Sequence, residues 1–304
     1  MNNLIVSASP HIRSKANTTV IMRDVIIALM PTLIAAIFIF GWRSLLVVGV
    51  CVAFAVLGEW GFEKLCKRDV TIGDLSAVVT GILLGFSLPV GIPLWQAAFG
   101  SIVAIVVVKQ LFGGIGKNFA NPAVTARIVM FIAFAGSMTT WQMPDAVSTA
   151  TPLVALKYGT GELPEILDLL IGNRAGCIGE TSIIALVIGG IYLMIRKVIT
   201  WHVPVTYLAT VFVLTAILGK EPVYQLLSGA VVLAAIFMAT DYTTTPQTKK
   251  GKFIYGLGCG MITVLIRVWG NYPEGVSFAI LLMNILTPHI NTLTRSKPLG
   301  GVKA

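Results

Sequence analysis

Long apolar runs, separated by short polar connections, make up most of this chain. They fall at about 23–41, 43–62, 75–91, 94–112, 123–140, 180–198, 202–219, 223–240, 254–270 and 276–291. Apolar runs of roughly 20 residues are long enough to cross the hydrocarbon core of a bilayer as helices. The pattern therefore predicts an all-α, polytopic membrane protein with about ten transmembrane helices. Glycine, serine or proline interrupts the runs at 75–91 and 223–240, so these two are the least regular.

The composition favours the same class of protein. Apolar types make up 56% of the 304 residues and charged types 12%, which is about half the charged share of a soluble domain. The net charge of +9 comes from Lys and Arg scattered between the apolar runs. It therefore indicates orientation in a membrane, and no nucleic-acid partner is expected. The four cysteines lack the C-x-x-C spacing of zinc or iron–sulfur sites, so no metal site is expected either.

Lys and Arg also predict the topology. If the N-terminus lies in the cytoplasm and the chain changes sides at each span, most of these residues fall in cytoplasmic segments. We expect a multi-pass protein of the inner or plasma membrane with both termini in the cytoplasm. The predicted parts are a cytoplasmic segment 1–22, a first transmembrane half 23–140, an extracytoplasmic loop 141–179, a second half 180–291 and a cytoplasmic tail 292–304. Five spans in each half force opposite orientations, which is the arrangement of an inverted repeat.

The 141–179 loop carries the run D-A-V-S-T-A-T-P-L at 145–153, which includes Asp145, Ser148 and Thr151. A hydroxyl on a small-residue turn is suited to the attachment of a phosphate-bearing cofactor. A Ser or Thr ahead of a proline is also ordinary chemistry for the start of a helix. The residue types alone leave both interpretations open.

Two glycine- and proline-rich segments also break the apolar pattern. Residues 80–93 contain glycines and prolines that interrupt a helix, and at membrane depth such backbone is buried in protein or lines a cavity. The Gly-rich turn at 112–123 lacks the spacing of a phosphate loop. Its residues Asn118 and Asn121 are suited to hydrogen-bond the polar edge of a planar ring held against Phe119. The alternative is that both asparagines cap and stitch the loop.

Acidic residues near the ends of spans are candidates for an ion path. Asp241 lies in the polar segment 240–246, and Asp24, Glu59 and Asp74 lie near the ends of other spans. Ionisable groups at membrane depth are costly and usually functional. The alternative for each one is a helix cap or a surface ion pair. Arg127 lies inside an apolar run and requires a partner.

The run at 145–153 resembles the flavin-attachment motif of a family that contains RnfD, a membrane component of the Rnf complex, and NqrB of the sodium-pumping NADH:quinone oxidoreductase. Further marks of the resemblance are Ser9-Pro10-His11, T-G-x-L-L-x-x-x-L-P at 80–89, K-x-x-x-G-G-x-G-K-N at 109–118, N-P-A at 121–123 and M-A-T-D-Y at 238–242. Together they extend over nearly the whole chain, and its length favours the Rnf branch. Thr149 departs from the family, which more often has Gly there. A β-branched residue stiffens that turn but leaves the Thr151 hydroxyl in place.

The resemblance implies one part, not a complete enzyme, of a complex that moves electrons between reduced ferredoxin and NAD and transports Na+ or H+. It implies FMN joined to Thr151 through a phosphoester, and a second, non-covalent riboflavin within the helix bundle. The implied partners are the other subunits of the Rnf complex (A, B, C, E and G), membrane lipid and a flavin transferase that works outside the cytoplasm. Without the resemblance, two other functions compete: a channel or secondary transporter for a small solute, and a helical scaffold without a cofactor.

Overall fold

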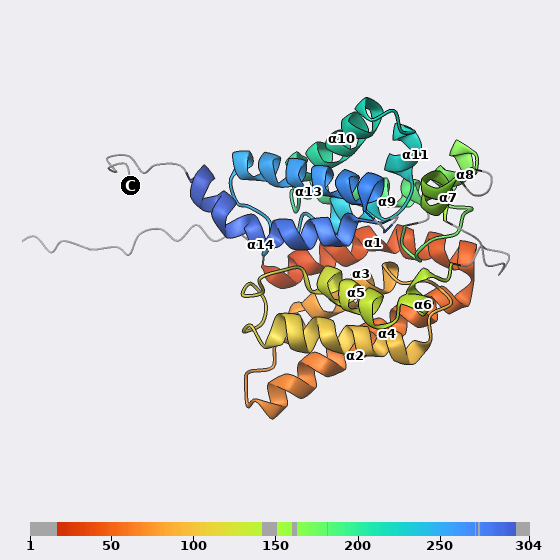
Figure 1. Cartoon of the computed structure of the whole chain (residues 1–304). Helices are drawn as coiled ribbons and strands as arrows, with labels where there is room; N and C mark the ends of the chain where they lie inside the picture. The colour runs from red at the N-terminus through yellow and green to blue at the C-terminus, as the bar shows by residue number, and fades with distance from the viewer. Residues whose placement is uncertain are drawn as a thin grey trace, which may run out of the picture.

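The computed structural model describes residues 17–141, 151–159, 163–180, 182–270, 272 and 274–295, and its regular elements are helices packed into one bundle (Figure 1). The first half contains α1 (Thr18–Phe40), α2 (Trp42–Leu65), the 3-10 turn η1 (Ile72–Asp74), α3 (Ser76–Phe86), α4 (Leu94–Ile102), the π-helix η2 (Val103–Gln110), α5 (Pro122–Ala133) and α6 (Ala135–Thr139). The connection contains α7 (Pro152–Tyr158) and α8 (Ile166–Ile171). The second half contains α9 (Ile183–Ile195), α10 (His202–Ile217), α11 (Pro222–Leu227), α12 (Val231–Leu233), the π-helix η3 (Ala234–Met238), α13 (Lys249–Trp269) and α14 (Val276–Thr294). The prediction of an all-α fold is confirmed for these residues.

Four of the helices, α1, α2, α13 and α14, are long and apolar enough to cross a membrane, and several shorter apolar helices lie among them. The predicted polytopic membrane fold is therefore confirmed, whereas the inverted repeat stays a prediction. Two predicted spans are shorter than expected. Helix α3 ends at Phe86, ahead of the Pro89 and Pro93 that remove backbone donors. The run at 223–240 breaks between α11 and α12, where Gly229 has a φ of 71°.

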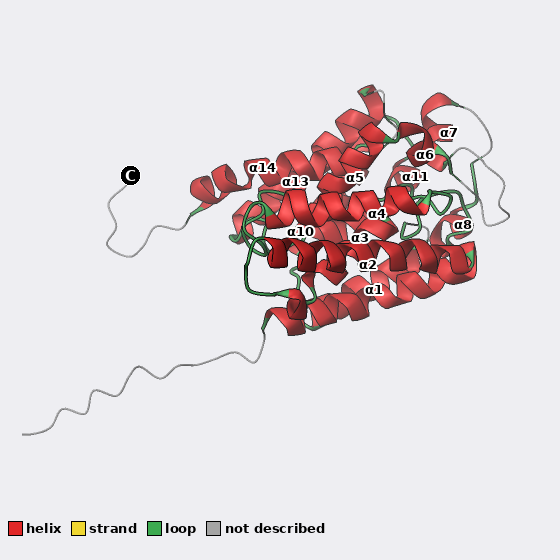
Figure 2. Ribbon diagram, turned by 90° about the horizontal axis from the view of Figure 1, so that it is seen from below, coloured by secondary structure: helices red, strands yellow, loops and turns green. Residues whose placement is uncertain are grey.

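The bundle has two distinct ends. Helices α7, α8 and α11 gather at one end, whereas α1 begins and α14 ends at the other (Figures 1 and 2). We call the first the Thr151 end and the second the terminal end. The described chain therefore starts and finishes on the same side of the bundle, as an even number of crossings requires.

Small residues set the closest contacts between helices. A Cβ atom added at Gly81 of α3 would lie 2.7 Å from the Cα atom of Val52 in α2, and one added at Gly85 would lie 3.0 Å from the Cα atom of Val48. Likewise, a Cβ atom at Gly189 of α9 would lie 2.2 Å from the carbonyl oxygen of Ala28 in α1. Membrane helices associate through such close backbone approach, because lipid gives no hydrophobic drive between them.

The segment that follows α8 enters the bundle and covers the broken end of α3. The Ile178 amide donates to the Leu88 carbonyl (3.0 Å), and the Gly179 amide donates to the Phe86 carbonyl (2.8 Å). Pro89 and Cys177 form an isolated antiparallel bridge. These contacts satisfy carbonyls that the end of α3 leaves free, so part of the predicted 141–179 loop is packed inside the protein.

Candidate functional site

A cavity at the terminal end brings together residues that are far apart in the sequence. It encloses about 800 Å³ of space, including its open mouth. Most of its wall is apolar. The polar residues that line it are Ser76, Thr80, Lys109, Asn118, Asn121, Thr240, Asp241, Tyr242 and Thr243. The structure thus places both predicted asparagines and Asp241 in one site.

Asn121 forms the N-cap of α5 and also ties the two halves together. Its Oδ1 atom accepts hydrogen bonds from the amides of Ala123 (3.0 Å) and Val124 (3.3 Å). Its Nδ2 atom donates to the carbonyl of Met238 (3.2 Å), at the end of η3. The capping alternative is therefore confirmed for Asn121, and the same side chain lies in the wall of the cavity.

Asn118 and Asp241 are joined through Thr243. The Asn118 Nδ2 atom donates to the Ala120 carbonyl (3.0 Å) and to the Thr243 hydroxyl (3.3 Å). That hydroxyl donates to the Asp241 Oδ2 atom (3.0 Å), which also accepts from the Thr244 hydroxyl (3.3 Å). Asp241 therefore organises the turn that follows η3, and its carboxylate faces a cavity that residues of the first half complete.

The structure does not place Phe119 in the cavity wall, so the expected contact of a bound ring with Phe119 stays a prediction. The Phe119 side chain is exposed and packs against Phe112, with ring centroids 4.8 Å apart, and it is not among the residues of the cavity wall. The aromatic side chains in the wall are Phe237, which is buried, and Tyr242, which is half exposed.

A buried polar network lies directly behind the cavity wall. The Glu59 Oε1 atom accepts from Lys109 Nζ (2.6 Å) and from Gln110 Nε2 (2.7 Å). Lys109 Nζ also donates to the Ser76 hydroxyl (2.6 Å), and this hydroxyl donates to Asp74. Two of the predicted ion-path candidates, Glu59 and Asp74, therefore belong to one network. Lys109 joins this network to the cavity, because its side chain belongs to both.

Both π-helices end at this site. Lys109 and Gln110 are the last residues of η2, and η3 ends at Met238, shortly before Asp241. A π-helix widens the turn and changes the direction of the side chains that follow, and such segments are frequent at functional sites. Here they direct polar side chains from each half toward the same cavity.

Asp24 lies apart from this network and forms an interhelical pair. Its Oδ2 atom accepts from Arg196, at the end of α9, with an Nη2–Oδ2 distance of 3.0 Å, and its Oδ1 atom accepts from the Tyr192 hydroxyl (3.3 Å). The ion-pair alternative is therefore confirmed for Asp24. The pair holds α1 against α9.

Thr151 is the N-cap of α7 at the opposite end of the bundle. Its Oγ1 atom accepts a hydrogen bond from the Val154 amide (3.3 Å), and the residue is only 4% exposed. Pro152 occupies the first position of the helix, as expected for a Thr-Pro start. Asp145 and Ser148 lie outside the described residues.

Helix α7 is fixed at both ends against the second half. Lys157, in its last turn, donates to the carbonyls of Gly270 and Tyr272 in the connection between α13 and α14. Leu153, in its first turn, contacts Gly229 at the break between α11 and α12. Thr151 is therefore held on a rigid support.

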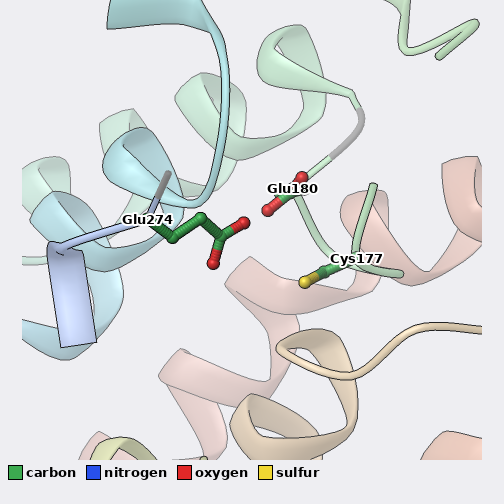
Figure 3. Close-up of side chains that lie close together, drawn as sticks. All are labelled: Cys177, Glu180 and Glu274. Carbon is green, nitrogen blue, oxygen red and sulfur yellow. The ribbon is translucent and has the colours of Figure 1, made fainter. Parts of the chain in front are cut away.

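A second group of ionisable side chains is buried among Arg127, Cys177, Glu180 and Glu274 (Figure 3). Arg127 forms an ion pair with Glu274 and donates to the Cys177 sulfur (3.4 Å), which identifies the partner that its sequence position requires. In Figure 3 the carboxylates of Glu180 and Glu274 point toward one another. Burial and the nearby Glu274 carboxylate raise the pKa of Glu180 to about 7. Cysteine and carboxylates are metal-ligand types, but a cation among them would lie against the positive charge of Arg127.

Comparison with known proteins gives full-length matches. The NQR2, RnfD, RnfE family matches residues 5–300. The D subunit of the Na(+)-translocating ferredoxin:NAD(+) oxidoreductase complex of Acetobacterium woodii is 48% identical, over 99% of this chain and 96% of the relative. The D subunit of the proton-translocating ferredoxin:NAD(+) oxidoreductase complex of Clostridium ljungdahlii is 41% identical, over 98% and 97%. The D subunit of the ion-translocating oxidoreductase complex of Aliivibrio salmonicida is 33% identical, over 98% and 99%.

Proposed function

Because the chain belongs to the NQR2, RnfD, RnfE family, we propose that it is the D-type membrane subunit of an ion-translocating ferredoxin:NAD(+) oxidoreductase complex. Relatives with that name align over nearly their whole length. The protein acts together with the other subunits of an Rnf-type complex. It lies in the cell membrane with both termini in the cytoplasm, a topology supported by the described chain beginning and ending at one end of the bundle (Figure 1).

In this proposal the protein carries FMN on Thr151 through a phosphoester. The observation that carries it is the position of Thr151, whose hydroxyl caps a short helix fixed at both ends against α13 and the break before α12. A fixed support matters because the protein's part in flavin chemistry is to set the position and surroundings of the ring. The flavin itself supplies one- and two-electron transfer when bound. A flavin transferase outside the cytoplasm would make the attachment.

The cavity at the terminal end is the proposed site of a second, non-covalent flavin such as riboflavin. Its apolar wall suits a planar ring, and Asn118 and Asn121 place amide groups at one side of it. Both amides already hold their positions through hydrogen bonds to backbone or to Thr243. They therefore present fixed polar groups to a ligand, as binding sites for small molecules usually do.

The ion path in this proposal runs past the same cavity. Lys109 contacts both the cavity and Glu59, and Asp74 is reached through Ser76. Asp241 lies across the cavity in the second half. Carboxylates at this position supply oxygen ligands for a small cation or acceptors for a proton.

Flavin fluorescence on a denaturing gel tests the covalent group. The purified chain, produced with its flavin transferase, should fluoresce, and Thr151→Ala should abolish the signal. Thr248→Ala is the matched control, because Thr248 caps α13 through the same kind of bond to the Gly251 amide (3.0 Å). Fluorescence that persists in Thr151→Ala would place the flavin elsewhere. A chain without any flavin would favour the small-solute transporter.

Flavin released by mild denaturation tests the second site. Asn118→Ala should lower the non-covalent flavin per protein at least several-fold and leave the fluorescent band intact. Asn118 is preferable to Asn121 for this purpose, because Asn121 also caps α5 and its loss costs about 1 kcal/mol of stability. An unchanged content of released flavin would move the second flavin away from this cavity.

A further inference from the structure

Two buried arginines converge on the break between α11 and α12. Arg174 Nη1 donates to the Leu227 carbonyl (2.6 Å), and Arg267 Nη2 donates to the Ser228 carbonyl (3.1 Å). Arg267 Nη1 also donates to the carbonyl and side-chain oxygens of Gln225. Arg174 is 1% exposed and Arg267 is 4% exposed. Both guanidinium groups are therefore almost completely removed from solvent.

Neither arginine is paired directly with a carboxylate, although the charges of Glu180 and Glu274 act on both from a longer distance. Among the described residues neither forms an ion pair within 4 Å, and both bind neutral carbonyl oxygens. Burial lowers the pKa of Arg174, which reflects this incomplete compensation. A buried cation without an anionic partner costs several kcal/mol in general. Such a cost favours the binding of a further negative charge in direct contact with the two guanidinium groups.

Three buried polar atoms at this break also lack a hydrogen-bond partner. They are the Nε atoms of Arg174 and Arg267 and the hydroxyl oxygen of Ser228. A buried donor left without an acceptor costs about 1–3 kcal/mol, so three in one place require an explanation. All three are able to donate to an oxygen-rich ligand. The unsatisfied donors and the lack of a directly paired carboxylate thus both favour an anion as the ligand.

The break lies against the helix that carries Thr151. At Gly229, whose φ is 71°, an added Cβ atom would lie 2.5 Å from Leu153 Cδ1 and 2.9 Å from Arg267 Nη2. The Arg267 guanidinium and the first turn of α7 therefore meet at the same glycine. Thr151 precedes Leu153 by two residues, which brings the proposed attachment point into the neighbourhood of the cationic group.

We propose that Arg174, Arg267 and Ser228 form an anion site that holds the phosphodiester of the group attached to Thr151. This inference rests on the proposed function and adds the residues that recognise the phosphate. Guanidinium groups suit this role, because their planar array of donors matches phosphate oxygens. The phosphate of a membrane lipid has the same chemistry, so the experiment has to separate these two sources.

The first measurement compares thermal unfolding with and without the attached group, in the purified complex. Flavin attachment, taken as the difference between the native chain and Thr151→Ala, should raise the unfolding temperature. That increment should be lost in Arg267→Gln and kept in Arg43→Gln. Arg43 is the matched control, since it also donates to a carbonyl, that of Val90 (3.0 Å), at the Thr151 end. The proposal would be overturned if flavin attachment raised the unfolding temperature equally in the protein with both native arginines, in Arg267→Gln and in Arg43→Gln.

A second measurement applies if Arg267→Gln carries no flavin or does not fold. Arg174→Gln then replaces it. Inorganic phosphate is titrated into Thr151→Ala, with and without the arginine substitution. Ligand binding to the native state raises the unfolding temperature, so phosphate should stabilise Thr151→Ala, and removal of the arginine should abolish this shift. Stabilisation that is the same in both proteins would overturn the anion site.

The two proposals fail in different ways. A native chain without covalent flavin refutes the attachment at Thr151, whereas the phosphate titration still reports on the arginines. Native mass spectrometry tests the lipid source. A phospholipid that stays bound to flavin-loaded native chain and is lost in Arg267→Gln would show that the site holds a headgroup, and would overturn its assignment to the phosphodiester.

Discussion

The ion pair of Lys109 and Glu59 allows a quantitative prediction. The two side chains are 3% and 0% exposed, and their charged atoms lie 2.6 Å apart. Removal of one partner from a buried pair costs about 3–5 kcal/mol, because the remaining charge stays buried. In Lys109→Met the Glu59 carboxylate keeps the amide of Gln110 as a donor, so we expect the lower value, about 3 kcal/mol. At about 2 °C for each kcal/mol, the unfolding temperature should fall by about 6 °C.

Thermal unfolding of the purified complex, followed by intrinsic fluorescence, measures this shift. The double variant Lys109→Met with Glu59→Gln should recover most of the loss, because no charge remains buried. Arg196→Met is the control, since its pair with Asp24 is similar in distance but the arginine is 47% exposed, whereas the carboxylate is 6% exposed. Water screens the arginine of this pair, and Asp24 keeps the Tyr192 hydroxyl as a donor, so the loss should be smaller than that for Lys109→Met. Equal shifts for Lys109→Met and Arg196→Met, or a double variant as unstable as the sum of the single ones, would refute the reasoning.

Two further predictions concern packing and pH. Gly81→Ala should lower the unfolding temperature, because the added Cβ atom meets the backbone of Val52 and such overpacking costs about 1–3 kcal/mol; Gly73→Ala, with open space around it, should have little effect. Glu180 should make stability depend on pH: its pKa is raised in the folded protein, so its contribution is present in acid and is lost as pH rises through about 7. The unfolding temperature of Glu180→Gln, measured relative to that of the native chain, should therefore rise between pH 5 and pH 8. A difference between the two proteins that does not change with pH would contradict the assignment.

The sequence could predict the all-helical membrane fold, because apolar runs of this length have few other solutions. Proline, glycine and serine within the apolar runs also indicated the two helix breaks, which the structure places after Phe86 and before Val231. The lengths of these helices could not be predicted as well. Where a helix ends depends on the segment that covers its free carbonyls, and that segment, around Ile178, is remote in sequence.

The candidate site was predictable by residue type but not by arrangement. Asn118 and Asp241 are both polar residues in apolar surroundings, which singles them out, yet their connection through Thr243 joins segments more than a hundred residues apart. Lys109 and Arg267 lie near the ends of the apolar runs 94–112 and 254–270. The structure buries both. A single basic residue at the end of an apolar run looks the same whether it faces solvent or turns inward to a partner.

The position of Lys109 suggests how electron and ion movements are linked in the proposed function. Lys109 lines the cavity and at the same time neutralises Glu59. A negative charge that developed on a ligand in the cavity would compete with Glu59 for this one ammonium group. If Lys109 were drawn toward the cavity, the buried Glu59 carboxylate would need another cation or a proton, because an isolated buried charge is too costly. Coupling of this kind requires no large movement of helices, since the two negative groups share a single counter-charge, and it is reciprocal: a cation bound at Glu59 would release Lys109 to stabilise the reduced ligand.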